Sequence, residues 1–173
     1  MRLSTLVRVG GAAAILAGAL RAASSFASGG SEVEHQALYF IIDLLLLLGA
    51  FAAYAQNHEA VGSLGAAGFL TTVAGILLVR SSRAVPGLDL YPAGALSVGI
   101  GWVLLTFAWW RSAKGSALVP VLFVLSIVTG FVGQMVSRAS LFVAAGVIFG
   151  AAVAQAGRQV FLGVATASES IDR

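Results

Sequence analysis

The sequence has no cysteine and few ionic side chains. Without cysteine the chain has no disulfide, no thiolate nucleophile and no cysteine-ligated metal site. Only 10% of its 173 residues are charged and 59% are hydrophobic, whereas a soluble domain carries roughly a quarter charged residues. Because so few charges cannot cover a water-exposed surface, we expect the outside of the folded chain to face lipid.

The basic residues outnumber the acidic ones, ten to seven. They are scattered along the chain at the ends of apolar runs and form no patch. This placement is typical of contact with lipid headgroups rather than with nucleic acid. We therefore expect a lipid bilayer, and no nucleic acid, as the surroundings of the chain.

Six apolar runs of about 20 residues follow one another, the length that crosses a hydrocarbon layer of about 30 Å. The predicted helices cover residues 9–27, 37–55, 61–79, 90–110, 117–136 and 140–161. The joints between them are short, so consecutive helices should be antiparallel neighbours. The prediction is an all-α integral membrane bundle of six transmembrane helices, forming one domain over residues 1–173.

Polar residues mark the joints, and the sequence Gln-Asn-His-Glu at 56–59 is expected to form the loop between the second and third helices. The first run, with its basic start and small residues near position 27, also fits a signal peptide. We expect this helix to be retained; its removal would leave five helices.

The basic residues also favour one orientation. With the N-terminus inside, the inner segments hold Arg2, Arg8, Arg111, Lys114, Arg158 and Arg173, and the outer segments hold Arg21, Arg80, Arg83 and Arg138. Lys and Arg are enriched in cytoplasmic loops. We therefore expect both termini on the cytoplasmic side. The membrane that we expect is a bacterial cytoplasmic membrane.

Small residues recur at helical spacing in four of the runs. The stripes are Gly11, Ala14 and Gly18; Gly94, Ser97 and Gly101; Ser126, Gly130 and Gly133; and Gly146, Gly150, Ala154 and Gly157. Small residues let helices approach closely in lipid. We expect these stripes to pack against neighbouring helices within the chain, with dimerisation as the alternative.

Asp43 is the one carboxylate well inside a predicted helix. An ionised acid near the bilayer centre costs a few kcal/mol, so it should have a partner. Arg21 lies about six residues before the end of the first helix and Asp43 about six residues into the second, which is equal depth in antiparallel neighbours. We predict a buried Arg21–Asp43 ion pair. The functional alternative is a ligand site, whose lining would add Tyr39, Tyr91, Trp102 and Gln134.

Other chemistry is harder to place. His35 and His58 flank the second predicted helix and should lie roughly 30 Å apart, so they cannot share one metal or haem. No helix brings Ser, His and an acid to one depth, and the glycines form no phosphate loop. We therefore expect no cofactor, no metal and no enzymatic activity.

The stretch Leu38-Tyr39-Phe40-Ile41-Ile42-Asp43-Leu44, continuing through Gly49 to Tyr54, resembles small multi-pass bacterial integral membrane proteins of unassigned role. That resemblance implies no activity. The length and helix count are also similar to the substrate-capture subunits of energy-coupling vitamin importers. In those proteins small residues of the first helix contact a partner, a pattern that Ala13 and Ala17 would fit.

The leading hypothesis is a non-enzymatic structural or accessory membrane subunit that acts through helix contacts with itself or with another membrane subunit. The alternative is a small-molecule binding or transport protein with a cavity between helices near Asp43. A wide cavity around an unpaired Asp43 would favour transport, whereas a closed core with a paired Asp43 would favour the accessory role.

Overall fold

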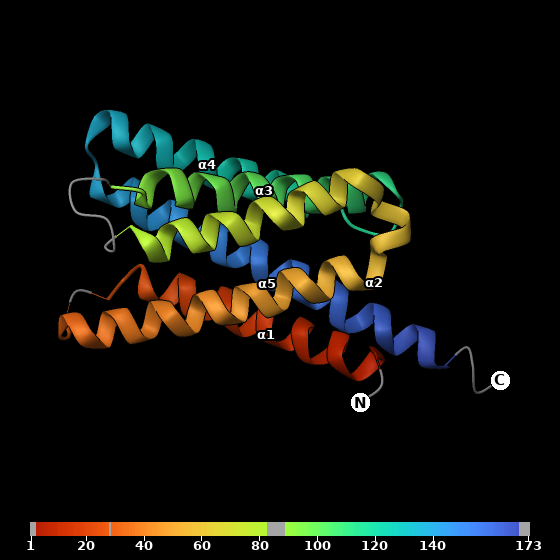
Figure 1. Ribbon diagram of the computed structural model, residues 1–173. Helices are drawn as coiled ribbons and strands as arrows, with labels where there is room; N and C mark the ends of the chain where they lie inside the picture. The colour runs from red at the N-terminus through yellow and green to blue at the C-terminus, as the bar shows by residue number, and fades with distance from the viewer. Residues whose placement is uncertain (1–2, 28, 83–88, 170–173) are drawn as a thin grey trace.

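The computed structural model describes residues 3–27, 29–82 and 89–169, with the side chains of residues 4–27, 29–82 and 89–163. These residues confirm the all-α class, and no strand occurs among them. The helices are α1 (Leu3–Ser24), α2 (Glu32–Ser81), α3 (Tyr91–Arg111), α4 (Leu118–Val136) and α5 (Ala139–Glu169) (Figure 1). Each of the five contains a segment long and apolar enough to cross a membrane.

The predicted count of six helices is wrong, because the second and third predicted helices are one helix of 50 residues, α2. Residues 56–59, expected as a loop, are helical. Their polar side chains turn back onto the helix: Asn57 Nδ2 donates to the Ala53 carbonyl at 3.2 Å, and His58 Nδ1 lies 3.1 Å from the Ala55 carbonyl oxygen. Polar side chains satisfied in this way extend the helix instead of ending it.

Helix α2 reverses its direction at Gly62, where φ is 55° and ψ is −150° (Figure 1). Only glycine adopts such backbone angles readily, because it has no Cβ. A straight helix would hold Asp43 and Arg80 about 55 Å apart, yet their side chains form an ion pair. The first limb of α2 (residues 32–61) and its second limb (residues 63–81) therefore lie side by side.

Local residues explain where the helices begin and end. The Ser31 hydroxyl accepts from the Glu34 backbone N–H at 3.3 Å, and the Ser31 N–H donates to Glu34 Oε2 at 2.7 Å, which is a capping box at the start of α2. Pro92 lies in the first turn of α3, where its missing N–H is not needed. Helix α4 ends at Ser137, which has left-handed backbone angles.

Glycines bring α1 and α5 into backbone contact. A Cβ added at Gly157 would lie 2.6 Å from the Gly11 carbonyl oxygen, and one added at Gly18 would lie 2.6 Å from the Ala154 nitrogen. The small-residue stripes predicted for the first and last helices thus face each other within the chain.

A second set of glycines joins the second limb of α2 to α3. A Cβ added at Gly75 would lie 2.8 Å from the Gly94 carbonyl oxygen, and one added at Gly101 would lie 2.7 Å from the Gly68 carbonyl oxygen. Helices approach this closely only where side chains are missing. We refer to these four glycines and their contacts as the α2–α3 seam.

Aromatic side chains fill the space between α3, α4 and α5. Trp102 is fully buried and stacks on Phe123 with ring centroids 5.3 Å apart, and Phe123 meets Phe149 edge to face at 5.4 Å. The outer side of α4 instead exposes large apolar residues, among them Phe131 and Met135. An apolar outer surface of this kind matches a lipid environment.

The bundle has two distinct ends (Figure 1). The Gly62 end holds the reversal of α2, the start of α1, the turn between α3 and α4, and the last turns of α5. The Ser31 end holds the start of α2, its last residue Ser81, and the turn between α4 and α5.

Candidate functional site

Asp43, the carboxylate predicted to lie inside a membrane span, is paired with Arg80 from the other limb of the same helix. Arg80 Nε donates to Asp43 Oδ2 at 2.5 Å, and a terminal guanidinium nitrogen contacts the same oxygen. The prediction that Asp43 forms its ion pair with Arg21 is therefore wrong. The physical reason is the reversal of α2, which brings Arg80, 18 residues after Gly62, level with Asp43, 19 residues before it.

The Asp43–Arg80 pair lies on the surface of the bundle, near the Ser31 end. The side chain of Asp43 is 18% exposed and that of Arg80 is 33% exposed. The guanidinium carbon of Arg80 lies 5.7 Å from the ring centre of the exposed Phe40, an arrangement in which ring and cation attract each other. The pair therefore joins the two limbs where the second limb ends.

Arg21 makes a separate set of contacts at the end of α1. Its Nη1 donates to the hydroxyls of Ser24 and Ser25 at 3.3 and 3.5 Å, and both hydroxyls donate to its own carbonyl oxygen. Its guanidinium carbon lies 5.9 Å from the Tyr39 ring centre. The structure thus brings together two residues of the predicted site, Arg21 and Tyr39. The carboxylate of Asp43 forms its ion pair with Arg80 instead.

The other predicted lining residues lie in different surroundings. Trp102 is in the core against Phe123, whereas Tyr91 and Gln134 are exposed on α3 and α4. Within the described residues none of the three is hydrogen-bonded to Asp43. The structure therefore places these candidates at separate positions and does not gather them into one site.

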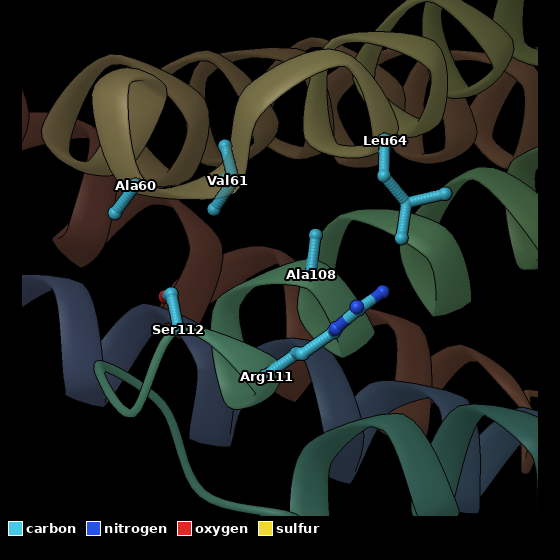
Figure 2. A pocket seen from close by; sticks show the side chains of 6 residues that line it. All are labelled: Ala60, Val61, Leu64, Ala108, Arg111 and Ser112. Atoms are coloured by element: carbon cyan, nitrogen blue, oxygen red, sulfur yellow. The ribbon is translucent and has the colours of Figure 1, made fainter.

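A pocket of about 250 Å³ occurs at the Gly62 end, away from Asp43. Its lining comes from two elements: Ala60, Val61 and Leu64 of α2, and Ala108, Arg111 and Ser112 at the end of α3. Figure 2 shows the Arg111 side chain extending toward Leu64 and Ser112 lying across from Ala60 and Val61. Sequence reasoning missed this pocket, because its walls depend on the backbone angles of Gly62.

Polar side chains tie the Gly62 end together. Gln56 Nε2 donates to the Val160 carbonyl at 3.4 Å, and the Ser116 N–H donates to Gln159 Oε1 at 3.2 Å. These bonds connect α5 both to α2 and to the turn after α3.

As for metals, the described residues contain no group of three or more His, Asp or Glu side chains that could hold an ion.

Comparison of the chain with protein-family models, with curated proteins and with solved structures finds no match in any of the three.

Proposed function

We propose that this chain is an integral protein of a bacterial cytoplasmic membrane that crosses the bilayer six times, with each limb of α2 crossing once. The limbs contain 30 and 19 residues (32–61 and 63–81), so they measure about 45 and 28 Å at 1.5 Å per residue. A hydrocarbon layer of about 30 Å needs helices of about this length. The apolar outer surface of α4 supports the same proposal.

Within the membrane we propose a non-enzymatic structural or accessory role, exercised through helix contacts with another membrane subunit or with a second copy of the chain. The observation that carries this proposal is the pairing of Asp43. A proton- or substrate-coupled site needs a carboxylate that is free to change partner beside an open cavity. Asp43 instead joins two limbs of one helix, and the 250 Å³ pocket lies at the other end of the bundle.

The proposed orientation has the Gly62 end in the cytoplasm. Arg8, Arg111, Lys114 and Arg158 belong to elements that meet at this end, and such residues favour the cytoplasmic side. Both termini would then be cytoplasmic. Arg2, Arg83 and Arg173, which also entered the orientation prediction, lie outside the described residues.

Single-cysteine labelling tests the six crossings directly, because the chain has no cysteine of its own. The variants are Ser31→Cys, Glu59→Cys, Lys114→Cys and Arg138→Cys, each treated with a membrane-impermeant maleimide on spheroplasts and after lysis. We expect Ser31→Cys and Arg138→Cys to react on spheroplasts, and the other two only after lysis. Reaction of Glu59→Cys on the same side as Ser31→Cys would contradict a crossing by each limb.

A double-mutant cycle tests the role of Asp43. We expect Asp43→Asn and Arg80→Gln each to destabilise the folded protein, with a coupling of about 1 kcal/mol, because the pair is partly exposed. Arg21→Gln is the comparison: the charge of Arg21 also acts on Asp43, so this variant should couple to Asp43→Asn, but more weakly than Arg80→Gln does. Unfolding by denaturing detergent measures all of these variants. If Asp43→Asn keeps full stability and abolishes proton uptake into proteoliposomes, Asp43 serves transport and the accessory role is wrong.

Purification in a mild detergent tests the accessory role itself. We expect a fixed ratio of this chain to a second membrane subunit, or a defined oligomer of the chain, by native mass spectrometry. A monomer that retains one stoichiometric small molecule would contradict the proposal and favour a binding protein.

A further inference from the structure

The pocket at the Gly62 end has one ionic group and an apolar wall. We name it the Arg111 pocket, for the six residues that line it: Ala60, Val61, Leu64, Ala108, Arg111 and Ser112. The Gly62 reversal turns α2 at this level, and the end of α3 lies opposite (Figure 2). Four of the six lining residues are apolar, and Arg111 is exposed, so its charge lies at the mouth of the pocket beside them.

Within the described residues, the Arg111 guanidinium makes no ion pair and no hydrogen bond. This contrasts with Arg80, which has Asp43, and with Arg21, which has two hydroxyls and a ring. Ser112 donates its hydroxyl proton to the Trp109 carbonyl at 2.8 Å, so its oxygen is left to accept. The pocket therefore offers a planar cation for an anion and an acceptor for a neighbouring hydroxyl or amine.

Basic residues at the same end of the bundle add to the attraction for an anion, and they outnumber the acid described there, Glu59, which precedes the lining residue Ala60. Lys114 follows Arg111 in the turn after α3, and Arg158 precedes Gln159, which accepts from the Ser116 N–H of that turn. Arg8 lies one turn before Gly11, and a Cβ added at Gly11 would lie 2.9 Å from the nitrogen of Phe161 in the same part of α5. Clustered cations at one end of a membrane protein attract anionic lipids of the facing leaflet.

We propose that the Arg111 pocket binds the headgroup phosphate of an anionic phospholipid. The phosphate pairs with the Arg111 guanidinium, a headgroup hydroxyl donates to Ser112 Oγ, and the glycerol carbons lie against Val61, Leu64 and Ala108. The volume of about 250 Å³ equals that of about eight water molecules at 30 Å³ each. It therefore accommodates a headgroup and leaves the acyl chains along the outer helix surface.

The surroundings favour a lipid over a free anion. A hydrated inorganic phosphate gains nothing from the apolar residues that form two thirds of the lining, whereas the glycerol of a lipid is held against them by its own acyl chains. The proposal rests on the membrane location proposed above, and it would not apply to a chain that lives in water.

Native mass spectrometry of the full-length, delipidated protein in detergent tests the proposal. The probes are dioleoyl phosphatidylglycerol, which is anionic, and dioleoyl phosphatidylcholine, which has no net charge. We expect the wild type to bind the first phosphatidylglycerol molecule more tightly than the first phosphatidylcholine molecule. Arg111→Gln should weaken that first event about tenfold, because it removes a charge-assisted contact. It should weaken phosphatidylcholine binding less, because the choline cation of that lipid already offsets its phosphate charge.

Two further variants make the result specific to the pocket. Lys114→Gln, the matched control, removes the same charge from the same turn outside the lining, and should change phosphatidylglycerol affinity less than about twofold. Ala60→Leu keeps Arg111 but fills part of the pocket from an exposed position, and should also weaken the first event. Ala60→Leu gives an independent answer if Arg111→Gln fails to fold.

Three results would overturn the proposal: equal phosphatidylglycerol affinity in wild type and Arg111→Gln, an equal loss in Arg111→Gln and Lys114→Gln, or displacement of the lipid by millimolar inorganic phosphate. The last result would identify a free anion as the ligand. Failure of the membrane assignment is a different outcome, because the chain would then stay dispersed without any detergent.

Discussion

Two neighbouring helix pairs of this bundle are held together in different ways. In the α2–α3 seam, glycines allow backbone to meet backbone, as at Gly101, where an added Cβ would lie 2.5 Å from the Thr72 nitrogen. Between α4 and α5, the nearest atom to an added Cβ is a side-chain carbon: the Ala145 Cβ, 3.6 Å away at Gly130, and the Leu141 Cβ, 3.0 Å away at Gly133. There a hydrogen bond from the Ser126 hydroxyl to the Ala145 carbonyl, 2.8 Å long, joins the helices.

The difference shows that apolar helices of one bundle can pack in two ways. Close backbone approach supplies many dispersion contacts but leaves no room for one more carbon. A looser pair tolerates larger residues and relies on individual side-chain contacts. The α2–α3 seam should therefore be sensitive to steric change, and the α4–α5 pair to the loss of a hydrogen bond.

The largest expected effect comes from adding one methyl group to each pair. Gly101→Ala should destabilise the protein by about 3 kcal/mol or more, because the Thr72 and Gly68 backbones cannot move aside independently. Gly130→Ala, the matched control, should change stability by under about 0.5 kcal/mol. Unfolding in mixed detergent micelles measures both variants. Equal effects would remove the distinction between the two pairs.

A smaller effect should follow from changes at the residues that precede the second limb of α2 and helix α5, which are Gly62 and Ser137. Gly62 and Ser137 both have positive φ, but Ser137 has ψ 40°, which L residues reach, whereas Gly62 has ψ −150°, which they avoid. Gly62→Ala should cost about 1–3 kcal/mol although nothing lies within 4 Å of the added Cβ.

The control substitution at the other turn is Ser137→Gly, which should stay within about 1 kcal/mol of the wild type. Thermal denaturation in detergent compares the two. A neutral Gly62→Ala would mean that the reversal of α2 can be made with ordinary backbone angles.

The smallest effect concerns the hydroxyl between α4 and α5. Ser126→Ala should cost about 0.6 kcal/mol, the typical worth of an interhelical hydrogen bond in a membrane. Ser97→Ala on α3 is the control, because the Ser97 hydroxyl donates to Ala93 within its own helix, and it should be neutral. Unfolding free energies of the two variants sharpen the comparison, and a larger loss at Ser97 would reverse it.

The sequence predicts much of this fold because its apolar runs are long and are separated by short polar joints. Apolar runs locate two helices to within one residue: the predicted 90–110 is Tyr91–Arg111, and the predicted 117–136 is Leu118–Val136. The ends of the others are less well predicted, since α1 begins at residue 3 and not 9, and α5 ends at residue 169 and not 161. Small-residue stripes predict close packing within the chain, and the structure shows that the stripes of α1 and α5 are partners. The prediction of a loop at residues 56–59 is wrong, because their polar side chains lie on a continuous helix.

The candidate site was harder to predict, because it depends on one backbone conformation. Gly62 is one of 21 glycines, and nothing in its neighbours reveals its angles. Depth measured from predicted helix ends paired Asp43 with Arg21. Depth measured from Gly62 gives 19 residues to Asp43 and 18 to Arg80, so the correct partner follows once the reversal is known. The Arg111 pocket depends on the same backbone conformation of Gly62, which the sequence does not predict.

The reversal at Gly62 fixes the rotational register of the second limb of α2 relative to the first, because no loop residues separate the two limbs. One residue inserted just after it would rotate the rest of the second limb by about 100°, turning Gly68 and Gly75 away from α3. The same insertion at Gly29, which has nothing within 4 Å of an added Cβ, would be absorbed by the loop before α2. Insertions and deletions between residues 62 and 81 should therefore be rare among natural variants of this chain, while the α1–α2 loop is free to change in length.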